Sequence, residues 1–172
     1  MTRLGDERRA RLREARLYLV CDAGGGVGGE LPTFLDAALR GGVDIVQLRD
    51  KAAGEEAILR AALTFRAAAD AHGALFVLND RPDLVAAVGA DGVHVGQDDM
   101  GLAEARALAG PDALVGRSTH TPAQVDEADD SGADYFAVGP VHATPTKPGR
   151  PAAGIELIRH AASRQERLNG ER

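Results

Sequence analysis

Short apolar runs alternate with longer amphipathic segments along the whole chain. The apolar runs predict strands over residues 17–21, 44–48, 74–78, 92–95, 114–116 and 135–138. The segments that separate or follow them predict helices over residues 31–39, 55–71, 82–88, 102–108, 122–130 and 154–163. Strands that alternate with helices indicate a parallel sheet with helical crossovers. Because the strands are almost wholly apolar, we expect both faces of the sheet to be covered.

Polar residues follow the second to the sixth of these strands, and this spread distinguishes two architectures. An open doubly wound sheet would gather them at one switch point, whereas a (β/α)8 barrel places them around one rim. The sequence therefore predicts an α/β fold of the TIM-barrel type, incomplete, with about six of the eight β/α units. We expect one domain over residues 1–172, with a charged, solvated helix in residues 1–15 and a polar tail in residues 164–172.

Composition narrows the classes of partner and compartment. The net charge of −6 argues against a broad nucleic-acid surface and against a patch for anionic membranes. The arginine-rich start has no apolar stretch suited to a signal peptide or a membrane helix. The single cysteine, Cys21, lies in an apolar run. We therefore expect a cytoplasmic protein with a buried, unreactive thiol and no nucleic-acid or membrane partner.

A similar phrase occurs twice where a predicted helix leads into a predicted strand. The two copies are residues 89–93, Gly-Ala-Asp-Gly-Val, and residues 132–136, Gly-Ala-Asp-Tyr-Phe. Glycine is the residue that most often ends a helix in the left-handed conformation. We interpret the phrase as a shared structural turn and not as a catalytic motif.

The most informative polar group directly follows the second strand, in the run Gln47-Leu48-Arg49-Asp50-Lys51. Side chains alternate between the two faces of a strand, so Gln47, Arg49 and Lys51 point the same way. Two cations and an amide at the end of a buried strand predict a site for a polyanion. The alternative interpretation is a structural ion pair between these cations and Asp50.

Carboxylates follow the next two strands, in Asn79-Asp80 and Gln97-Asp98-Asp99. Carboxylates at the tips of neighbouring strands can share a hard cation. Mg²⁺ takes one or two carboxylates and completes its shell with water and substrate phosphate. The alternative is that these aspartates cap the helices that follow. Beside the basic cluster, we favour the Mg²⁺ site.

Three other groups of residues carry candidate chemistry. The loop over residues 144–150 combines two threonines with a lysine and an arginine, which suits an anionic leaving group, although a plain surface loop is the alternative. Ser118-Thr119-His120 ends the fifth strand, and its hydroxyls suit phosphate; no G-x-S-x-G elbow supports a hydrolase. His94 shares the inward face of its strand with Gly96, which leaves room for a flat ring; a core histidine is the alternative.

Residues 24–29, Gly-Gly-Gly-Val-Gly-Gly, imitate the dinucleotide fingerprint G-x-G-x-x-G after the first strand. Asp50 even lies about 20 residues further on, where a ribose-binding acid is expected. A run this rich in glycine matches almost any glycine pattern, and Arg49 and Lys51 flank the acid. A nucleotide-dependent oxidoreductase therefore stays an alternative, which titration with NAD(P)H would test.

Five sequence segments recur in the same order in one known family. They are Val46–Lys51, Asn79–Arg81, Gly89–Asp99, Gly116–His120, and Val138–Pro140 together with Thr144–Lys147. Together these segments resemble thiamine phosphate synthase. That family is a (β/α)8 barrel that joins hydroxymethylpyrimidine diphosphate to a thiazole phosphate and releases diphosphate. The resemblance therefore implies a transferase of thiamine biosynthesis with these two small-molecule substrates.

The resemblance also implies a role for each residue of the predicted site. The residues that would hold the diphosphate are Arg49, Lys51, Asn79, Ser118 and Lys147. Of these, the residues that would act in catalysis are Lys147, Arg49, Lys51 and Ser118. The ligands of Mg²⁺ would be Asp80 and Asp99. The residues that would frame the pyrimidine are Gln47, His94 and Gly96, and those that would contact the thiazole phosphate are Thr144 and Thr146.

The family pattern continues into a seventh and an eighth strand that have no counterpart in this sequence. The turns after those strands help the family bind the thiazole phosphate, so we expect mainly the pyrimidine half of the site. The chain would then be a weak or inactive synthase, a barrel completed by another chain or within a homo-oligomer, or a non-catalytic binding protein. A thiazole tautomerase of the same superfamily is a further alternative, against which Arg49, Lys51 and Lys147 argue.

Overall fold

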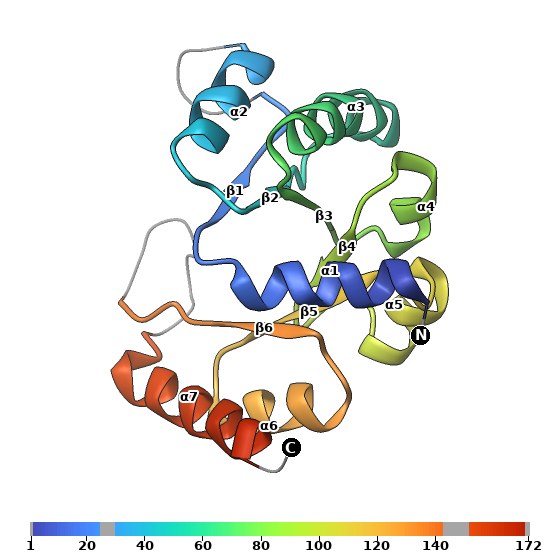
Figure 1. The fold of residues 1–172 in the computed structure, drawn as a ribbon. Coiled ribbons are helices and arrows are strands. Elements are labelled where there is room, and N and C mark those ends of the chain that lie inside the picture. Colours follow the sequence, from blue (N-terminus) through green and yellow to red (C-terminus); the bar gives the residue numbers. More distant parts are fainter. Residues whose placement is uncertain (1, 25–29, 143–151, 171–172) are drawn as a thin grey trace.

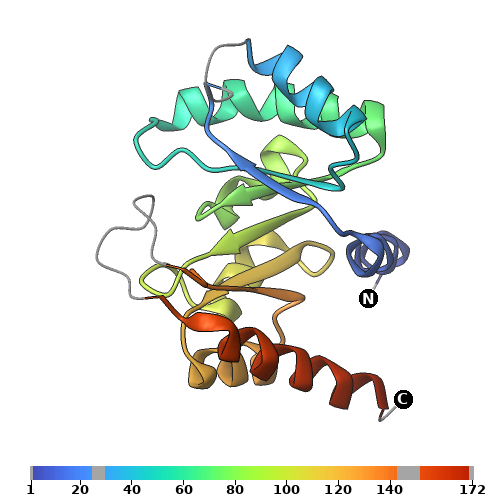
Figure 2. The same ribbon diagram turned by 90° about the vertical axis from the view of Figure 1, so that its left-hand side faces the viewer.

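The structure is a computed structural model that describes residues 2–24, 30–142 and 152–170. Six strands form one sheet in the order β1-β2-β3-β4-β5-β6, and every neighbouring pair is parallel (Figures 1 and 2). Because the strand order never reverses, the sheet has no switch point and is not doubly wound. The structure confirms the predicted fold class, an incomplete barrel of the TIM type.

The strands are β1 (Tyr18–Cys21), β2 (Ile45–Leu48), β3 (Leu75–Asn79), β4 (Gly92–Val95), β5 (Leu114–Thr119) and β6 (Tyr135–Val138). The helices are α1 (Arg3–Glu14), α2 (Leu31–Arg40), α3 (Glu55–His72), the short η1 (Pro82–Leu84) with α4 (Val85–Val88), α5 (Leu102–Ala109), α6 (Pro122–Asp130) and α7 (Gly154–Gly170). Every predicted element is present. The main differences are a longer β5, a split helix over residues 82–88, and α7, which continues as a helix through most of the predicted polar tail.

Side chains on the strands alternate between the inside and the outside of the barrel. The outward residues pack beneath the helices in the main core and include Val46, Phe76, Val93 and Val115. The inward residues at the amino-terminal end form a smaller cluster, made of Ile45, Leu75, Val77 and Leu114. The same alternation points the polar side chains near the carboxyl-terminal ends of the strands toward the interior of the barrel.

Helix α1 lies across the amino-terminal ends of the strands (Figure 1). Leu12 packs against the inner apolar cluster. Arg8 Nε donates to Asp91 at 3.0 Å, and Arg9 Nε donates to Asp134 at 2.7 Å. Most residues of α1 are exposed, as expected of a solvated helix, but these contacts also attach the helix to the barrel. α1 therefore closes the amino-terminal end of the barrel, which we call its floor. Two of its arginines form ion pairs with aspartates that directly precede β4 and β6.

Strands β1 and β6 are the two edges of the sheet, and the described residues place no further strand beside either of them. Side chains of the two edge strands nevertheless meet near the amino-terminal ends of the strands. The hydroxyls of Tyr18 and Tyr135 lie 2.9 Å apart, and their ring centroids are 5.9 Å apart. The gap left by the incomplete barrel is therefore bridged near its floor by a pair of tyrosines.

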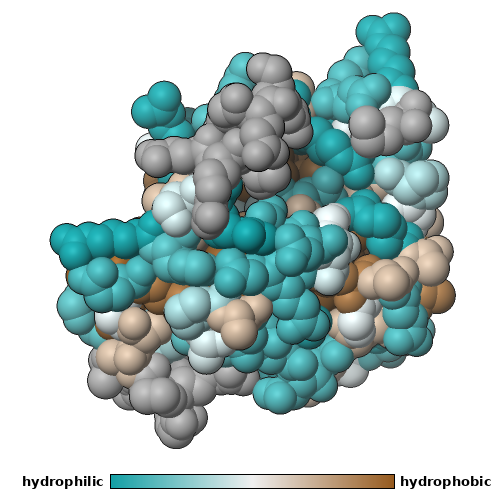
Figure 3. Space-filling model, turned by 90° about the horizontal axis from the view of Figure 1, so that it is seen from below, coloured by the Kyte–Doolittle hydropathy of each residue, from teal (hydrophilic) through white to brown (hydrophobic). Residues whose placement is uncertain are grey.

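Hydrophilic residues predominate on the face seen from below in Figure 1, with only scattered hydrophobic ones (Figure 3). Within the described ranges, no helix combines the length and apolarity needed to cross a bilayer.

Cys21 is partly rather than fully buried and packs against the main core. Burial raises the pKa of the Cys21 thiol to about 11, so it stays protonated at neutral pH.

Candidate active site

A cavity of about 920 Å³ lies inside the barrel toward the carboxyl-terminal ends of the strands. Every described residue that the sequence assigned to the site lines this cavity: Gln47, Arg49, Lys51, Asn79, Asp80, His94, Gly96, Asp99 and Ser118. The remaining three predicted residues, Thr144, Thr146 and Lys147, lie outside the described residues. Strand alternation thus brings side chains from β2, β3, β4 and β5 to one basin.

Two amide side chains join β2 to β3 in the middle of the cavity wall. Gln47 is buried, and its Nε2 donates to Asn79 Oδ1 at 3.0 Å. Asn79 Nδ2 in turn donates to Asp80 Oδ2 at 2.6 Å. These bonds fix the orientation of both amides and leave the Gln47 carbonyl oxygen as a hydrogen-bond acceptor.

The predicted alternative, an ion pair with Asp50, does not form. The Asp50 carboxylate accepts the backbone N–H of Ala52 at 3.1 Å and of Ala53 at 3.0 Å, which closes the turn after β2. Arg49 is exposed at the cavity and forms no ion pair with any described residue. Its guanidinium is therefore available to an anion.

Lys51 instead lies between the two predicted metal ligands. Its Nζ is 3.1 Å from Asp80 Oδ2 and 3.8 Å from Asp99 Oδ2. Burial raises the pKa of Asp80, the Asp99 charge adds to this rise, and the Lys51 hydrogen bond opposes it. Two carboxylates that converge on one cation form the hard oxygen set that Mg²⁺ prefers. Among the described residues no group of three His, Cys, Asp or Glu lies close enough together to hold a metal ion.

The capping alternative is wrong for Asp80 and Asp99. Both η1 and α5 begin without a side-chain cap. Asp80 adopts the left-handed conformation, with φ 57°. Asp99 Oδ2 accepts the Gly96 N–H at 3.0 Å, and a Cβ on Gly96 would overlap the Asp99 carboxylate. Gly96 therefore makes room for the Asp99 carboxylate, and its predicted role beside a flat ring stays a prediction.

His94 is buried and hydrogen-bonded on both sides of its ring. Its Nε2 lies 2.9 Å from Ser118 Oγ, and its Nδ1 lies 3.3 Å from the Tyr135 hydroxyl. The imidazole beside Ser118 is thus not the one nearest in sequence, because His120 Nδ1 bonds to the carbonyl of Gly139. Strand alternation aims His94 inward beside Ser118.

Sequence reasoning missed Tyr18 and Tyr135, although both line the cavity. They are the two tyrosines of the chain, and each is the first residue of its strand. The strand register could have indicated Tyr135 as a site residue. Tyr135 pairs with Gly116, and Gly116 pairs with His94, so the three residues lie side by side on the inward face of neighbouring strands. A Cβ on Gly116 would overlap the Tyr135 ring, so glycine at that position admits the ring into the interior.

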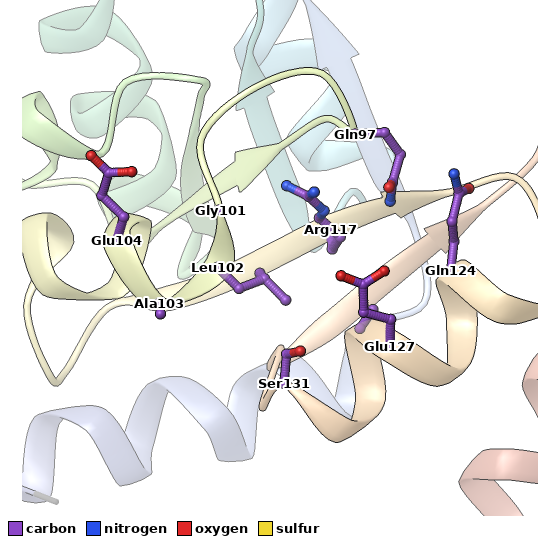
Figure 4. A pocket seen from close by; sticks show the side chains of 10 residues that line it. Gln97, Gly101, Leu102, Ala103, Glu104, Arg117, Gln124, Glu127 and Ser131 are labelled. Carbon is purple, nitrogen blue, oxygen red and sulfur yellow. The ribbon is translucent and has the colours of Figure 1, made fainter.

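A second cavity of about 550 Å³ lies between α5 and α6 (Figure 4). Arg117 lines it, and its Nη1 donates to the carbonyl of Met100 at 2.9 Å. Because Arg117 alternates with Gly116 and Ser118 along β5, it points away from the interior. Of the predicted site residues that the structure describes, none lines this cavity and all line the cavity inside the barrel.

Comparison with known proteins agrees with this geometry. The profile of the family described as thiamine monophosphate synthase matches residues 17–167. The chain belongs to the thiamine monophosphate synthase family. It is 51% identical over 166 residues to a thiamine-phosphate synthase of Gloeobacter violaceus and 53% identical over 156 residues to one of Thermobifida fusca.

The match covers most of this chain but only part of its relatives. It spans 96% of this chain and 48% of the Gloeobacter protein, and 90% of this chain and 71% of the Thermobifida protein. A solved thiamine phosphate pyrophosphorylase from Pyrococcus furiosus superposes with a TM-score of 0.77 at 30% identity, over 90% of this chain and 71% of that one. The described part of the chain thus has the architecture of the family over most of its own length.

Proposed function

We propose that this chain carries the pyrimidine-diphosphate half of a thiamine phosphate synthase. The reaction joins hydroxymethylpyrimidine diphosphate and a thiazole phosphate to give thiamine phosphate and diphosphate. The observation that supports this most directly is the convergence of Arg49, Lys51, Asp80 and Asp99 on one cavity beside a buried amide pair. Cations and a carboxylate pair in one basin suit a metal-bound diphosphate.

The chemistry requires charge neutralisation and positioning rather than a protein nucleophile. An electron-rich aminopyrimidine can lose diphosphate to give a stabilised carbocation, which the thiazole nitrogen then captures. Arg49, Lys51 and Ser118 would bind the departing diphosphate, and fixed donors that meet developing charge are an efficient source of rate enhancement. Gln47 and Asn79 would orient the pyrimidine and the diphosphate for in-line departure.

Mg²⁺ fits the carboxylate pair, and Asp80 and Asp99 would hold it. When bound, the ion would neutralise charge on the diphosphate oxygens. Lys51 Nζ now bridges the two carboxylates. We expect Lys51 to turn from them toward the diphosphate when the ion binds, because an ammonium group and Mg²⁺ would compete for the same oxygens.

The family resemblance supplies the roles of the residues outside the described ranges. Lys147 would assist departure of the diphosphate, and Thr144 and Thr146 would contact the thiazole phosphate. A Lys147→Ala protein should lose turnover more than it loses affinity for the pyrimidine substrate. Full turnover by that protein would exclude Lys147 from catalysis.

The open edges of β1 and β6 bear on turnover by this chain alone. Each edge strand presents unpaired backbone donors and acceptors. We propose that full activity needs two further strands across this gap, which would complete the eight-stranded barrel of the family. The lone, partly buried thiol of Cys21 is consistent with a reducing compartment such as the cytoplasm.

Binding of inorganic diphosphate with Mg²⁺ tests the proposal without requiring turnover. At a ligand concentration of 100 times the dissociation constant, binding stabilises the fold by about 2.7 kcal/mol. For a domain of this size that corresponds to a rise in Tm of roughly 5–10 °C. Arg49→Gln should abolish most of this rise, whereas Arg60→Gln should not, since Arg60 is exposed on α3 and paired with Glu56.

The outcomes separate the proposed synthase from its alternatives. A tautomerase-like relative predicts no thermal shift with diphosphate and Mg²⁺, and an oxidoreductase predicts binding of NAD(P)H instead. A non-catalytic binding protein predicts the thermal shift without thiamine phosphate formation, even when the two missing units are added. The absence of any shift in the unmodified protein would refute the proposed function.

A further inference from the structure

A row of four polar side chains crosses the interior of the barrel along the wall of the cavity. Tyr18 Oη and Tyr135 Oη lie 2.9 Å apart, and Tyr135 Oη lies 3.3 Å from His94 Nδ1. His94 Nε2 lies 2.9 Å from Ser118 Oγ. The row thus connects β1, β6, β4 and β5, and it ends at the hydroxyl that we assign to the diphosphate.

The surroundings hold this row in place. A Cβ on Gly116 would overlap the ring of Tyr135, which shows how closely that ring packs on β5. The ring of Tyr135 also lies against the His94 ring, with centroids 5.6 Å apart. Burial raises the pKa of both Tyr18 and Tyr135, so both phenols are neutral hydroxyls at neutral pH.

An anion at one end determines the direction of every hydrogen bond in the row. A diphosphate oxygen only accepts, so Ser118 must donate its single proton to it and accept from His94 Nε2–H. A neutral imidazole that donates from Nε2 accepts at Nδ1, and the available donor there is the Tyr135 hydroxyl. With its proton used, the Tyr135 oxygen can accept from Tyr18. Hydrogen bonds aligned in this way strengthen one another.

We propose that Tyr135, supported by Tyr18, is a positioning residue that keeps His94 in the Nε2–H tautomer, so that Ser118 presents its proton to the diphosphate. The inference rests on the proposed function for the identity of the anion. The opposite polarity would have Ser118 donate to His94 and turn its lone pairs toward the anion, which would repel it. The tautomer of His94 therefore decides between the two arrangements.

The first test is read on the unmodified protein, and a substitution in the row serves only to assign the signals. Long-range ¹H–¹⁵N NMR of protein labelled with ¹⁵N-histidine reports which ring nitrogen carries the proton. A His94→Asn protein assigns the His94 signals among those of the five histidines. We expect the Nε2–H tautomer at neutral pH, both with and without diphosphate. A proton on Nδ1, or on both nitrogens, would overturn the inference.

The second test is a double-mutant cycle read by calorimetric titration with inorganic diphosphate and Mg²⁺. Tyr135→Phe should weaken binding about three- to tenfold, the range expected for one hydrogen bond. In a Ser118→Ala background the same substitution should have little further effect, because Tyr135 acts only through the hydroxyl that is already absent. Tyr18→Phe should weaken binding less than Tyr135→Phe. An equal loss from Tyr135→Phe in both backgrounds would indicate a merely structural role and refute the inference.

The two proposals fail differently. If the unmodified protein binds no diphosphate, the proposed function is wrong, and the tautomer of His94 still supports or overturns the polarity of the row. If diphosphate binds but Tyr135→Phe leaves both its affinity and the His94 tautomer unchanged, the proposed function stands and the positioning role is wrong.

Discussion

Asp91 is the position where loss of one carboxylate should destabilise this fold most clearly. It is buried, and it accepts from Arg8 Nε at 3.0 Å, from Arg66 Nη1 at 2.9 Å and from the backbone N–H of Phe76 at 2.9 Å. These contacts join α1, α3 and β3 to the start of β4. Asp91→Ala would break all three at once.

The magnitude follows from the groups left behind. The buried N–H of Phe76 would lose its acceptor, at a cost of about 1–3 kcal/mol. The arginine side chains are 15% and 21% exposed, so water can partly replace their lost bonds. We therefore expect Asp91→Ala to lower the free energy of unfolding by about 3–5 kcal/mol in total, as for one partner removed from a buried pair.

Asp70 provides the matched control, because it pairs with the same Arg66 at 2.7 Å while its own side chain is 68% exposed. Asp70→Ala should cost at most about 0.5 kcal/mol. Urea unfolding followed by circular dichroism measures both values, since urea carries no charge that would screen the pairs. Equal costs for Asp91→Ala and Asp70→Ala would refute the role assigned to Asp91.

Three further predictions address single groups. Hydrogen bonds from the backbone N–H groups of Arg16 and Leu17 lower the pKa of Asp44. The stabilisation from the Asp44 carboxylate is therefore complete above its unfolded pKa of about 3.9 and is lost as pH falls through its lower folded pKa. In acid titrations, the stability difference between wild type and Asp44→Asn should shrink below about pH 4, and a constant difference would contradict this. With a pKa of about 11, Cys21 should react with iodoacetamide at pH 8 about a hundredfold slower than an ordinary thiol. The rate of this reaction should rise steeply up to pH 10. Fast labelling at pH 8 would contradict this and show an exposed thiolate. Gly96→Ala should displace the Asp99 carboxylate, which a Cβ at this position would overlap. In calorimetric titrations, the Mg²⁺-dependent part of diphosphate binding should weaken about tenfold. Unchanged Mg²⁺ dependence would exclude Asp99 as a ligand of the ion.

The pattern of apolar and polar positions was enough to predict the elements and their class. Strand and helix periodicity is local, so it appears in the sequence whatever the tertiary contacts are. The rule that parallel strands present their carboxyl ends at one rim then grouped Arg49, Asp80, His94 and Ser118 into one site. The structure places all four in one cavity.

Capping and pairing were harder to predict because several partners competed for each side chain. Asp50 lies between two cations in the sequence, yet it accepts the N–H groups of Ala52 and Ala53. Asp99 precedes a helix, yet it bonds to Gly96 and approaches Lys51. Neighbours in sequence offer the same chemistry to all of these groups, and only the path of the backbone selects among them.

The sequence by itself thus determined the order of the strands and helices, the inward face of each strand and the residues at the rim, because each depends on periods of a few residues. Only the tertiary structure decided that α1 closes the floor through Arg8 and Arg9, and that Tyr18 meets Tyr135 across 117 residues. Such partners are set by the curvature of the sheet and by the height of each side chain within it. Both depend on the packing of every strand together, which no local segment encodes.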